Sequence, residues 1–118
     1  MSQDFTMTKE ERQMYLIRLL NDAFRTSLVG GKVMLTSGVQ ALADSDRDAV
    51  IEAVRRFNNF SAGDDPYGEH DFGRVEVAKD AYFWKIDYLD RSLEHASDDP
   101  ACIEQTVRVL TIMACEEF

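Results

Sequence analysis

The segment DDPYGEHD at positions 64–71 is the densest cluster of residues whose side chains could do chemistry. A histidine titrates near neutral pH, so His70 could act as a general acid or base if Glu69 or Asp71 orients its ring. Lys85 follows on a later strand, and we expect it to lie near this cluster. If the protein is an enzyme, the candidate catalytic residues are therefore His70, Asp71 and Lys85.

A structural role is the commoner one for such loop side chains, because Asp and His in turns often bond backbone N–H groups. No activated nucleophile is indicated, since the chain has no Gly-x-Ser-x-Gly motif and neither cysteine is close to a histidine in sequence. The spacing matches neither the EF-hand loop nor the H-E-x-x-H motif, so we predict no metal site and no cofactor.

A magnesium-dependent nuclease is the remaining catalytic alternative, because it would need carboxylates beside a lysine. The acidic surroundings of such a site would repel a phosphate backbone, which makes this signal weak. The residues of suitable type are Asp71, Glu76, Lys79, Lys85 and Asp87.

Charge is divided unevenly along the chain, whose 22 acidic and 13 basic residues give a net charge of −9. Residues 1–57 hold 8 acidic and 8 basic residues, whereas residues 58–118 hold 14 acidic and 5 basic ones. A basic nucleic-acid-binding surface is therefore missing, and repulsion disfavours direct binding to nucleic acid or to an anionic membrane. The excess negative charge of residues 58–118 either keeps the protein soluble or favours binding to a protein partner with a basic surface.

The length of 118 residues predicts one globular domain over 1–118, with residues 1–7 disordered. The N-terminus has no apolar stretch typical of a signal peptide, and no apolar run is long enough to span a membrane. Cys102 and Cys115, if both lie on one helix, are about 20 Å apart and too distant for a disulfide. We therefore expect a cytoplasmic protein with reduced thiols, either a monomer or a homodimer.

Two helices and a strand are predicted before the acidic loop. The first helix spans 8–26, begins with the capping-box pair Thr8 and Glu11, and carries an apolar stripe. A strand at 32–36 and a helix at 45–57 follow. The loop at 58–71 is rich in Gly, Asn, Asp and Pro, and loops of that length are often functional. The first helix is expected to bury Leu16, Leu19, Leu20, Ala23 and Phe24.

A hairpin is predicted next, with strands at 72–77 and 81–89. Because side chains alternate along a strand, Tyr82, Trp84, Ile86 and Tyr88 share a core face. The opposite face is mixed and partly exposed, and Phe83 on that face is an interface candidate because aromatic residues are enriched at interface hot spots.

The last element, 100–116, has the spacing of either a helix or a strand. Asp99 and Pro100 are typical of a helix start, so a helix is favoured. The predicted fold class is α+β: a small, largely antiparallel sheet, made of one strand plus the hairpin, packed against about three helices.

Several motifs resemble a bacterial domain-of-unknown-function family. They are NDAFR (21–25), TSGV (36–39), DPYGEHDFG (65–73), FWKIDYLD (83–90) and RVLTIM (108–113), spread over residues 10–118. Members of that family usually carry tyrosine where this chain has Leu89 and Phe118. The resemblance implies a short single-domain protein that is frequent in alphaproteobacteria and often encoded on plasmids or other mobile segments.

A mobile-element setting makes one kind of non-catalytic function attractive, because small acidic proteins on such elements can block CRISPR effectors or restriction enzymes. These complexes hold DNA in basic grooves, and an acidic face can occupy such a groove in place of phosphate. We therefore expect a protein-binding module, with the small enzyme based on His70 as the alternative. The candidate partner-binding residues are Asp64, Asp65, Tyr67, Glu69, His70, Asp71, Phe83 and Asp87, with Asp90, Glu94, Asp98 and Asp99 as further candidate contacts.

Overall fold

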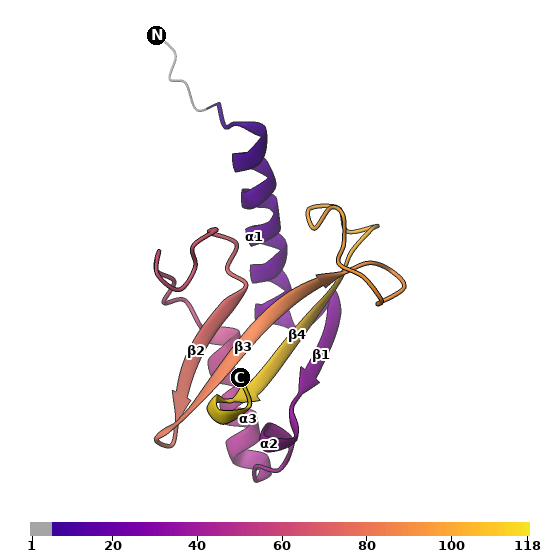
Figure 1. The fold of residues 1–118 in the computed structure, drawn as a ribbon. Coiled ribbons are helices and arrows are strands. Elements are labelled where there is room, and N and C mark those ends of the chain that lie inside the picture. The colour runs from indigo at the N-terminus through magenta and orange to yellow at the C-terminus, as the bar shows by residue number, and fades with distance from the viewer. Residues whose placement is uncertain (1–5) are drawn as a thin grey trace.

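A computed structural model describes residues 6–118, which form a layer of helices packed against one sheet (Figure 1). The chain runs through helix α1, strand β1, helices α2 and α3, the hairpin β2–β3, strand β4 and a short 3₁₀ helix η1. This arrangement confirms the predicted α+β class. The first five of the seven residues predicted to be disordered lie outside the described part. The elements span Lys9–Ser27 (α1), Gly31–Leu35 (β1), Ser37–Gln40 (α2), Asp44–Arg56 (α3), Phe72–Val77 (β2), Asp80–Leu89 (β3), Val107–Ala114 (β4) and Cys115–Glu117 (η1).

The four strands form one mixed sheet in the order β1-β4-β3-β2. Strands β1 and β4 pair in parallel, whereas the pairs β4–β3 and β3–β2 are antiparallel. Trp84 in β3 lies opposite Ile112 of β4 and Gly73 of β2. Helices α1 and α3 lie behind the sheet in Figure 1, α2 lies at its lower end, and the opposite sheet face carries no α-helix in the described part.

The core lies between the covered sheet face and the helices. Trp84, Ile112 and Leu110 are fully buried from the sheet side, and Val50 and Val54 meet them from α3. The predicted alternation of β3 is confirmed, because Tyr82, Trp84 and Ile86 are buried whereas their neighbours are only partly so. Burial of this apolar surface is the main force that holds the helices on the sheet.

The prediction of a helix at 100–116 is wrong, because residues 107–114 form strand β4 in the middle of the sheet. The helix-start signal at Asp99 is used for a tight turn: its carboxylate accepts from the Ala101 N–H at 3.2 Å and its carbonyl accepts from the Cys102 N–H at 2.9 Å. Pairing with strands on both sides outweighs this local signal, which is the usual outcome when tertiary contacts compete with propensity. Free Cys102 and Cys115 therefore lie on this turn and on η1, not on a shared helix.

Helix α1 begins as predicted but buries a different face. Thr8 and Glu11 form the expected capping box, with Glu11 N–H donating to Thr8 Oγ1 at 3.0 Å. Leu16 and Leu19, however, are 47% and 46% exposed. The N-terminal half of α1 rises beyond the end of the sheet in Figure 1, so part of the apolar stripe has no core to meet. The residues that α1 buries are Ile17, Asn21, Phe24 and Arg25.

The two long loops lie at the same end of the sheet, on either side of α1 (Figure 1). Arg18 Nε donates to the Gly68 carbonyl at 2.7 Å, which joins α1 to the loop at 58–71. Gln13 Nε2 approaches Asp99 Oδ1 at 3.4 Å, which joins α1 to the loop at 90–106. Helix α1 is therefore the element that positions both loops. No helix in residues 6–118 is long and apolar enough to cross a membrane.

Candidate functional site

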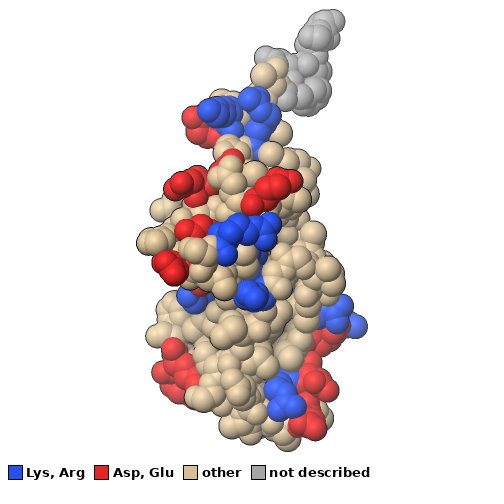
Figure 2. Space-filling view, turned by 90° about the vertical axis from the view of Figure 1, so that its right-hand side faces the viewer, with Lys and Arg blue, Asp and Glu red and all other residues tan. Residues whose placement is uncertain are grey.

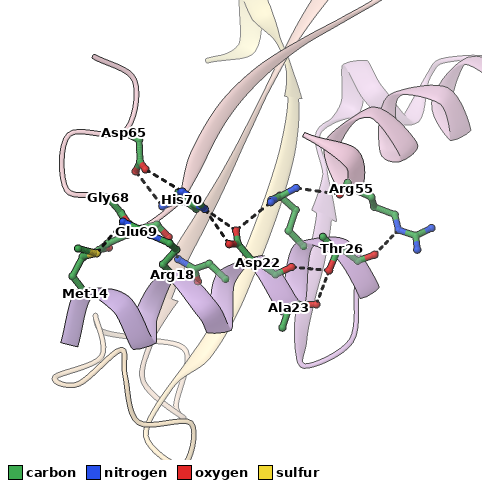
Figure 3. Close-up of polar contacts among 12 residues, drawn as sticks. Met14, Arg18, Asp22, Ala23, Thr26, Arg55, Asp65, Gly68, Glu69 and His70 are labelled. Carbon is green, nitrogen blue, oxygen red and sulfur yellow. Dashed lines mark hydrogen bonds and ion pairs between the residues drawn. The ribbon is translucent and has the colours of Figure 1, made fainter. Parts of the chain in front are cut away.

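The imidazole of His70 lies between two carboxylates (Figure 3). Its Nδ1 is 2.9 and 3.0 Å from the two oxygens of Asp22, and its Nε2 is 3.7 Å from Asp65 Oδ2. Phe60 stacks on the ring with the centroids 3.6 Å apart and the planes within 2° of parallel. The ring is thus hydrogen-bonded through Nδ1, faces a second carboxylate through Nε2, and is stacked on one face.

The loop reaches this geometry through its own backbone. Asp65 Oδ1 accepts from the His70 N–H at 3.1 Å, and the Asp65 carbonyl accepts from the Gly68 N–H at 3.1 Å. His70 has φ 58° and Gly68 has φ 70°, both in the left-handed region. That region is free of strain for glycine, while histidine enters it more readily than most residues do. The loop side chain Asp65 therefore supplies the turn and a carboxylate for the ring at the same time.

A buried hydrogen-bond network beneath the loop centres on Asn21, which is fully buried. Its Nδ2 donates to the Glu69 carbonyl at 3.0 Å and to Tyr88 Oη at 2.8 Å, and its Oδ1 accepts from Arg108 Nε at 2.7 Å. Tyr88 Oη in turn donates to Glu69 Oε1 at 2.7 Å. Burial, followed by the hydrogen bond to Glu69, raises the pKa of Tyr88 well above its ordinary value, so this hydroxyl remains a donor.

Arg25 is the second buried polar side chain of α1. Its Nη1 donates to the carbonyls of Val54 and Arg55 at 3.0 and 3.1 Å, which satisfies the last turn of α3. Its guanidinium carbon lies 5.1 Å from the Trp84 ring centre, and its Nη2 is 3.2 Å from Asp22. Burial lowers the pKa of Arg25, and the bond to Asp22 acts in the opposite direction. Asp22 thus bridges a buried cation and His70.

The predicted catalytic residues are not brought together. His70 contacts Asp22 and Asp65, whereas Lys85 Nζ pairs with Asp87 Oδ2 at 2.6 Å on the uncovered sheet face. Asp71 makes no ion pair in the described part. Burial raises the pKa of Asp71, and the nearby carboxylate of Glu69 raises it further. Residues 6–118 also hold no group of three His, Cys, Asp or Glu side chains placed to bind a metal ion.

The predicted partner-binding residues divide into exposed and anchored side chains. Tyr67 is 77% exposed, and Asp64 beside it is exposed with only Ser61 Oγ near its carboxylate, at 3.2 Å. Asp65, in contrast, is buried, and Glu69, His70 and Asp71 are half-buried. Phe83 packs against Phe72 and Phe118 on the uncovered sheet face, where Asp87 also lies.

Asn21, Asp22, Arg25 and Arg108 were not among the residues singled out by spacing. Three of them lie in the motif NDAFR, where two polar residues four positions apart flank Phe24 on one side of the helix. Residues four positions apart lie on the same side of a helix, and here that side also carries the core residue Phe24. Polar residues on a core-facing side are usually buried with hydrogen-bond partners, and this signal could have identified Asn21 and Arg25. Arg108 sits among apolar β4 residues, which is the same kind of signal in a strand.

Comparison with known proteins identifies a family. A family model described as "Protein of unknown function (DUF3768)" matches residues 35–117. This range includes the loop with His70 and the whole sheet except the first four residues of β1, while α1 lies outside it. No curated protein and no solved structure matches the chain. Since the matched range covers well over half of the 118 residues, the chain belongs to the DUF3768 family of proteins of unknown function.

Proposed function

We propose that the protein is a non-catalytic binding module whose acidic end docks onto the basic surface of a protein that handles nucleic acid. The loop at 58–71 has four acidic residues and no Lys or Arg, and the loop at 90–106 has five acidic residues and one arginine. Both loops lie at one end of the sheet, on either side of α1 (Figure 1). This gathering of negative charge from two distant segments is the observation that carries the proposal.

Three exposed carboxylates at this end lack a Lys or Arg partner among the described residues. Asp64, Glu94 and Asp98 are exposed and form no ion pair with Lys or Arg. Burial is the main cause of the raised pKa of Asp71, and the nearby carboxylate of Glu69 raises this pKa further, so like charges add to the cost of ionising this group. Such an arrangement costs stability, and unfavourable charge clusters are more common at functional sites than elsewhere.

The acidic loops are held in place before any partner binds. Arg18 anchors Gly68 on one side of α1, and Arg91 anchors the other loop by donating to the carbonyls of Ile103 and Glu104 at 2.7 and 3.0 Å. Binding by a preorganised loop loses less conformational entropy. Tyr67, exposed beside Asp64, supplies an aromatic anchor of the kind that is enriched in interface hot spots.

The partner of this proposal is a nucleoprotein complex with a basic DNA-binding groove, such as a CRISPR effector or a restriction enzyme. Carboxylates would occupy the positions of phosphates, so the protein and DNA would compete. A gene carried on a plasmid or other mobile segment of an alphaproteobacterium would benefit from such an inhibitor. This setting is part of the proposal.

The alternative of a small enzyme based on His70 has less support. A general base needs a ring nitrogen within reach of a substrate proton. Nδ1 of His70 is taken by Asp22, and Nε2 faces Asp65 at 3.7 Å. Two flanking carboxylates suit a ring that fastens the loop onto α1.

The test compares two triple variants in a binding and inhibition assay. The loop variant carries Asp64→Lys, Glu94→Lys and Asp98→Lys, all at exposed positions with no Lys or Arg partner. The control carries Asp48→Lys, Asp80→Lys and Glu116→Lys, also exposed, at the other end of the sheet. The two triple variants change the net charge of the protein by the same amount. Tagged proteins would be used to capture purified CRISPR effector and restriction complexes, with duplex DNA as competitor.

The expected result is that the parent and the control variant retain a complex, that the loop variant loses it, and that DNA displaces it. The retained complex should also cleave DNA more slowly. Equal capture by both variants, capture that DNA does not reduce, or no capture at all would overturn the proposal. Circular dichroism of each variant separates lost binding from lost fold.

A further inference from the structure

A groove of about 690 Å³ opens beside β1, next to the acidic loop at 90–106 but away from its exposed carboxylates Glu94 and Asp98. Its walls come from the C-terminal half of α1, the start of β1, the start of β4 and the end of the loop at 90–106. The volume lies within the range of about 300–1,000 Å³ that small-molecule sites occupy. Apolar side chains from α1, the connection between α1 and β1, the loop at 90–106 and β4 form much of the wall: Leu20, Phe24, Val29, Ile103 and Val107.

The groove is basic on a strongly acidic protein. Lys32, Arg91 and Arg108 line it, against one carboxylate, that of Glu104. Arg91 donates only to backbone carbonyls, and Lys32 makes no hydrogen bond or ion pair with the described residues. Figure 2 shows this side of the molecule, with Lys and Arg atoms in the middle of the face, acidic side chains above them, and below them an uncharged area with charged side chains at its margins.

Arg108 forms the inner end of the basic lining. Its Nε is bound to Asn21 Oδ1 at 2.7 Å and its Nη2 to the Pro100 carbonyl at 2.6 Å, so its direct acceptors are neutral. Burial lowers the pKa of Arg108, and Glu69, which forms no ion pair with it, is one of the groups that act in the opposite direction. Arg108 is only 4% exposed and its guanidinium carbon lies 5.2 Å from the Tyr88 ring centre, so it adds positive potential to the groove without being a contact for a ligand.

The exposed apolar stripe of α1 continues the wall. Leu16, Leu19, Leu20 and Ala23 have the spacing of a buried helix face, yet Leu16 and Leu19 are almost half exposed. Leu20 and Ala23 lie in the groove itself, and Val29 at its edge is 76% exposed. The helix thus presents an apolar track beside three cations, which is the chemistry of an amphipathic anion.

We propose that this groove binds a small organic acid with an apolar body, whose carboxylate is held by Lys32 and Arg91 and whose chain lies along Leu20, Val29 and Ile103. Opposite charge and apolar area then act together: ion pairing orients the head group, and removal of the chain from water supplies most of the affinity. Decanoate is a suitable probe because it combines one carboxylate with a flexible apolar chain.

The experiment titrates the full-length protein with decanoate by calorimetry and follows amide shifts by NMR, with decanol as the matched neutral ligand. We expect decanoate to bind at least about tenfold more tightly than decanol, because charge-assisted hydrogen bonds are worth roughly that factor or more. Lys32→Gln should weaken decanoate binding about three- to tenfold and leave decanol binding unchanged. Lys79→Gln, which removes an exposed cation from the β2–β3 turn, is the matched control and should change neither.

Ile103→Ser tests the apolar wall separately, because Ile103 is 55% exposed and its replacement should not unfold the protein. This variant should weaken the binding of both decanoate and decanol. The proposal is overturned if decanoate does not bind at millimolar concentration, if decanol binds equally well, or if Lys79→Gln weakens decanoate as much as Lys32→Gln does. The residues tested here differ from those of the acidic end, so either proposal can fail while the other stands.

Discussion

The imidazole Nδ1 of His70 lies 2.9 Å from a carboxylate oxygen of Asp22, although the two residues are 48 positions apart. This contact joins a loop without helices or strands to the middle of α1. Asp22 also pairs with the buried Arg25, which in turn completes the last turn of α3. One carboxylate therefore links the loop, α1 and α3, and the position of the acidic loop depends on it.

A double-mutant cycle on this pair should reveal the link. We expect Asp22→Asn and His70→Gln each to lower the free energy of unfolding by about 1–2 kcal/mol, since each removes a partly buried hydrogen bond to a charged group. The double variant should lose less than the sum, with a coupling energy of about 1 kcal/mol. Urea denaturation at pH 7 gives the free energy of unfolding of the parent, the two single variants and the double variant. Strictly additive losses of stability would contradict a direct interaction between the two side chains.

Asn21 should be the most sensitive polar residue of α1. Asn21→Ala would leave Arg108 Nε and the Glu69 carbonyl without their partner inside the protein, and it would remove one bond from the Tyr88 hydroxyl. We expect a loss of about 3 kcal/mol in the free energy of unfolding, because unsatisfied buried groups add their desolvation cost. Gln13→Ala, which removes only a 3.4 Å contact to Asp99, is the control and should cost less than about 0.5 kcal/mol. Similar losses for the two variants would show that the network contributes little.

Local patterns predicted most elements well. The capping box at Thr8, the hairpin and its alternating faces, and the long loop at 58–71 all follow from residues close together in the chain. Strand β4 was only the less favoured alternative to a helix, because no local signal reports that a segment will be paired with other strands on both sides. The turn at Asp99 and Pro100 resembles a helix start because both place side-chain acceptors near free N–H groups.

The candidate site was predicted only in part. His70 and the acidic loop stand out by composition, but the partners that hold them come from α1 and β4, where Asn21 and Arg108 lie on faces expected to be apolar. Polar residues become buried there because each finds a partner from another segment, and pairing of that kind is not visible in one sequence. The apolar stripe of α1 exists, but Leu16 and Leu19 are exposed, Leu20 and Ala23 line a groove, and only Phe24 reaches the core.

Gly73 is required by the packing of Trp84 in the neighbouring strand. A Cβ at position 73 would lie 2.4 Å from Trp84 Nε1 and 2.7 Å from Cε2, closer than any side chain tolerates. Because Trp84 is fully buried, it cannot move away, and we expect Gly73→Ala to cost about 3 kcal/mol of stability. Gly63→Ala is the matched control, since nothing lies within 4 Å of its Cβ position. Thermal unfolding should show a large decrease for the first variant and at most a small change for the second; equal midpoints would mean that the Trp84 ring can shift.

Asp71 should be destabilising at neutral pH, because burial and the Glu69 carboxylate raise its pKa in the folded protein. An acid whose folded pKa is raised binds protons more tightly when folded, so ionisation at pH 7 opposes folding. Asp71→Asn removes that charge and should raise the free energy of unfolding at pH 7 by roughly 0.5–1 kcal/mol, a modest value because the group is partly solvated. The advantage should shrink as the pH falls from the folded pKa towards the ordinary value of 3.8, below which both forms are neutral. Asp98→Asn, at an exposed position of the other loop, should bring no such gain. A loss of stability for Asp71→Asn at pH 7 would instead mean that the ionised carboxylate is a needed acceptor, and the charge at the acidic end would then contribute to the fold as well as to binding.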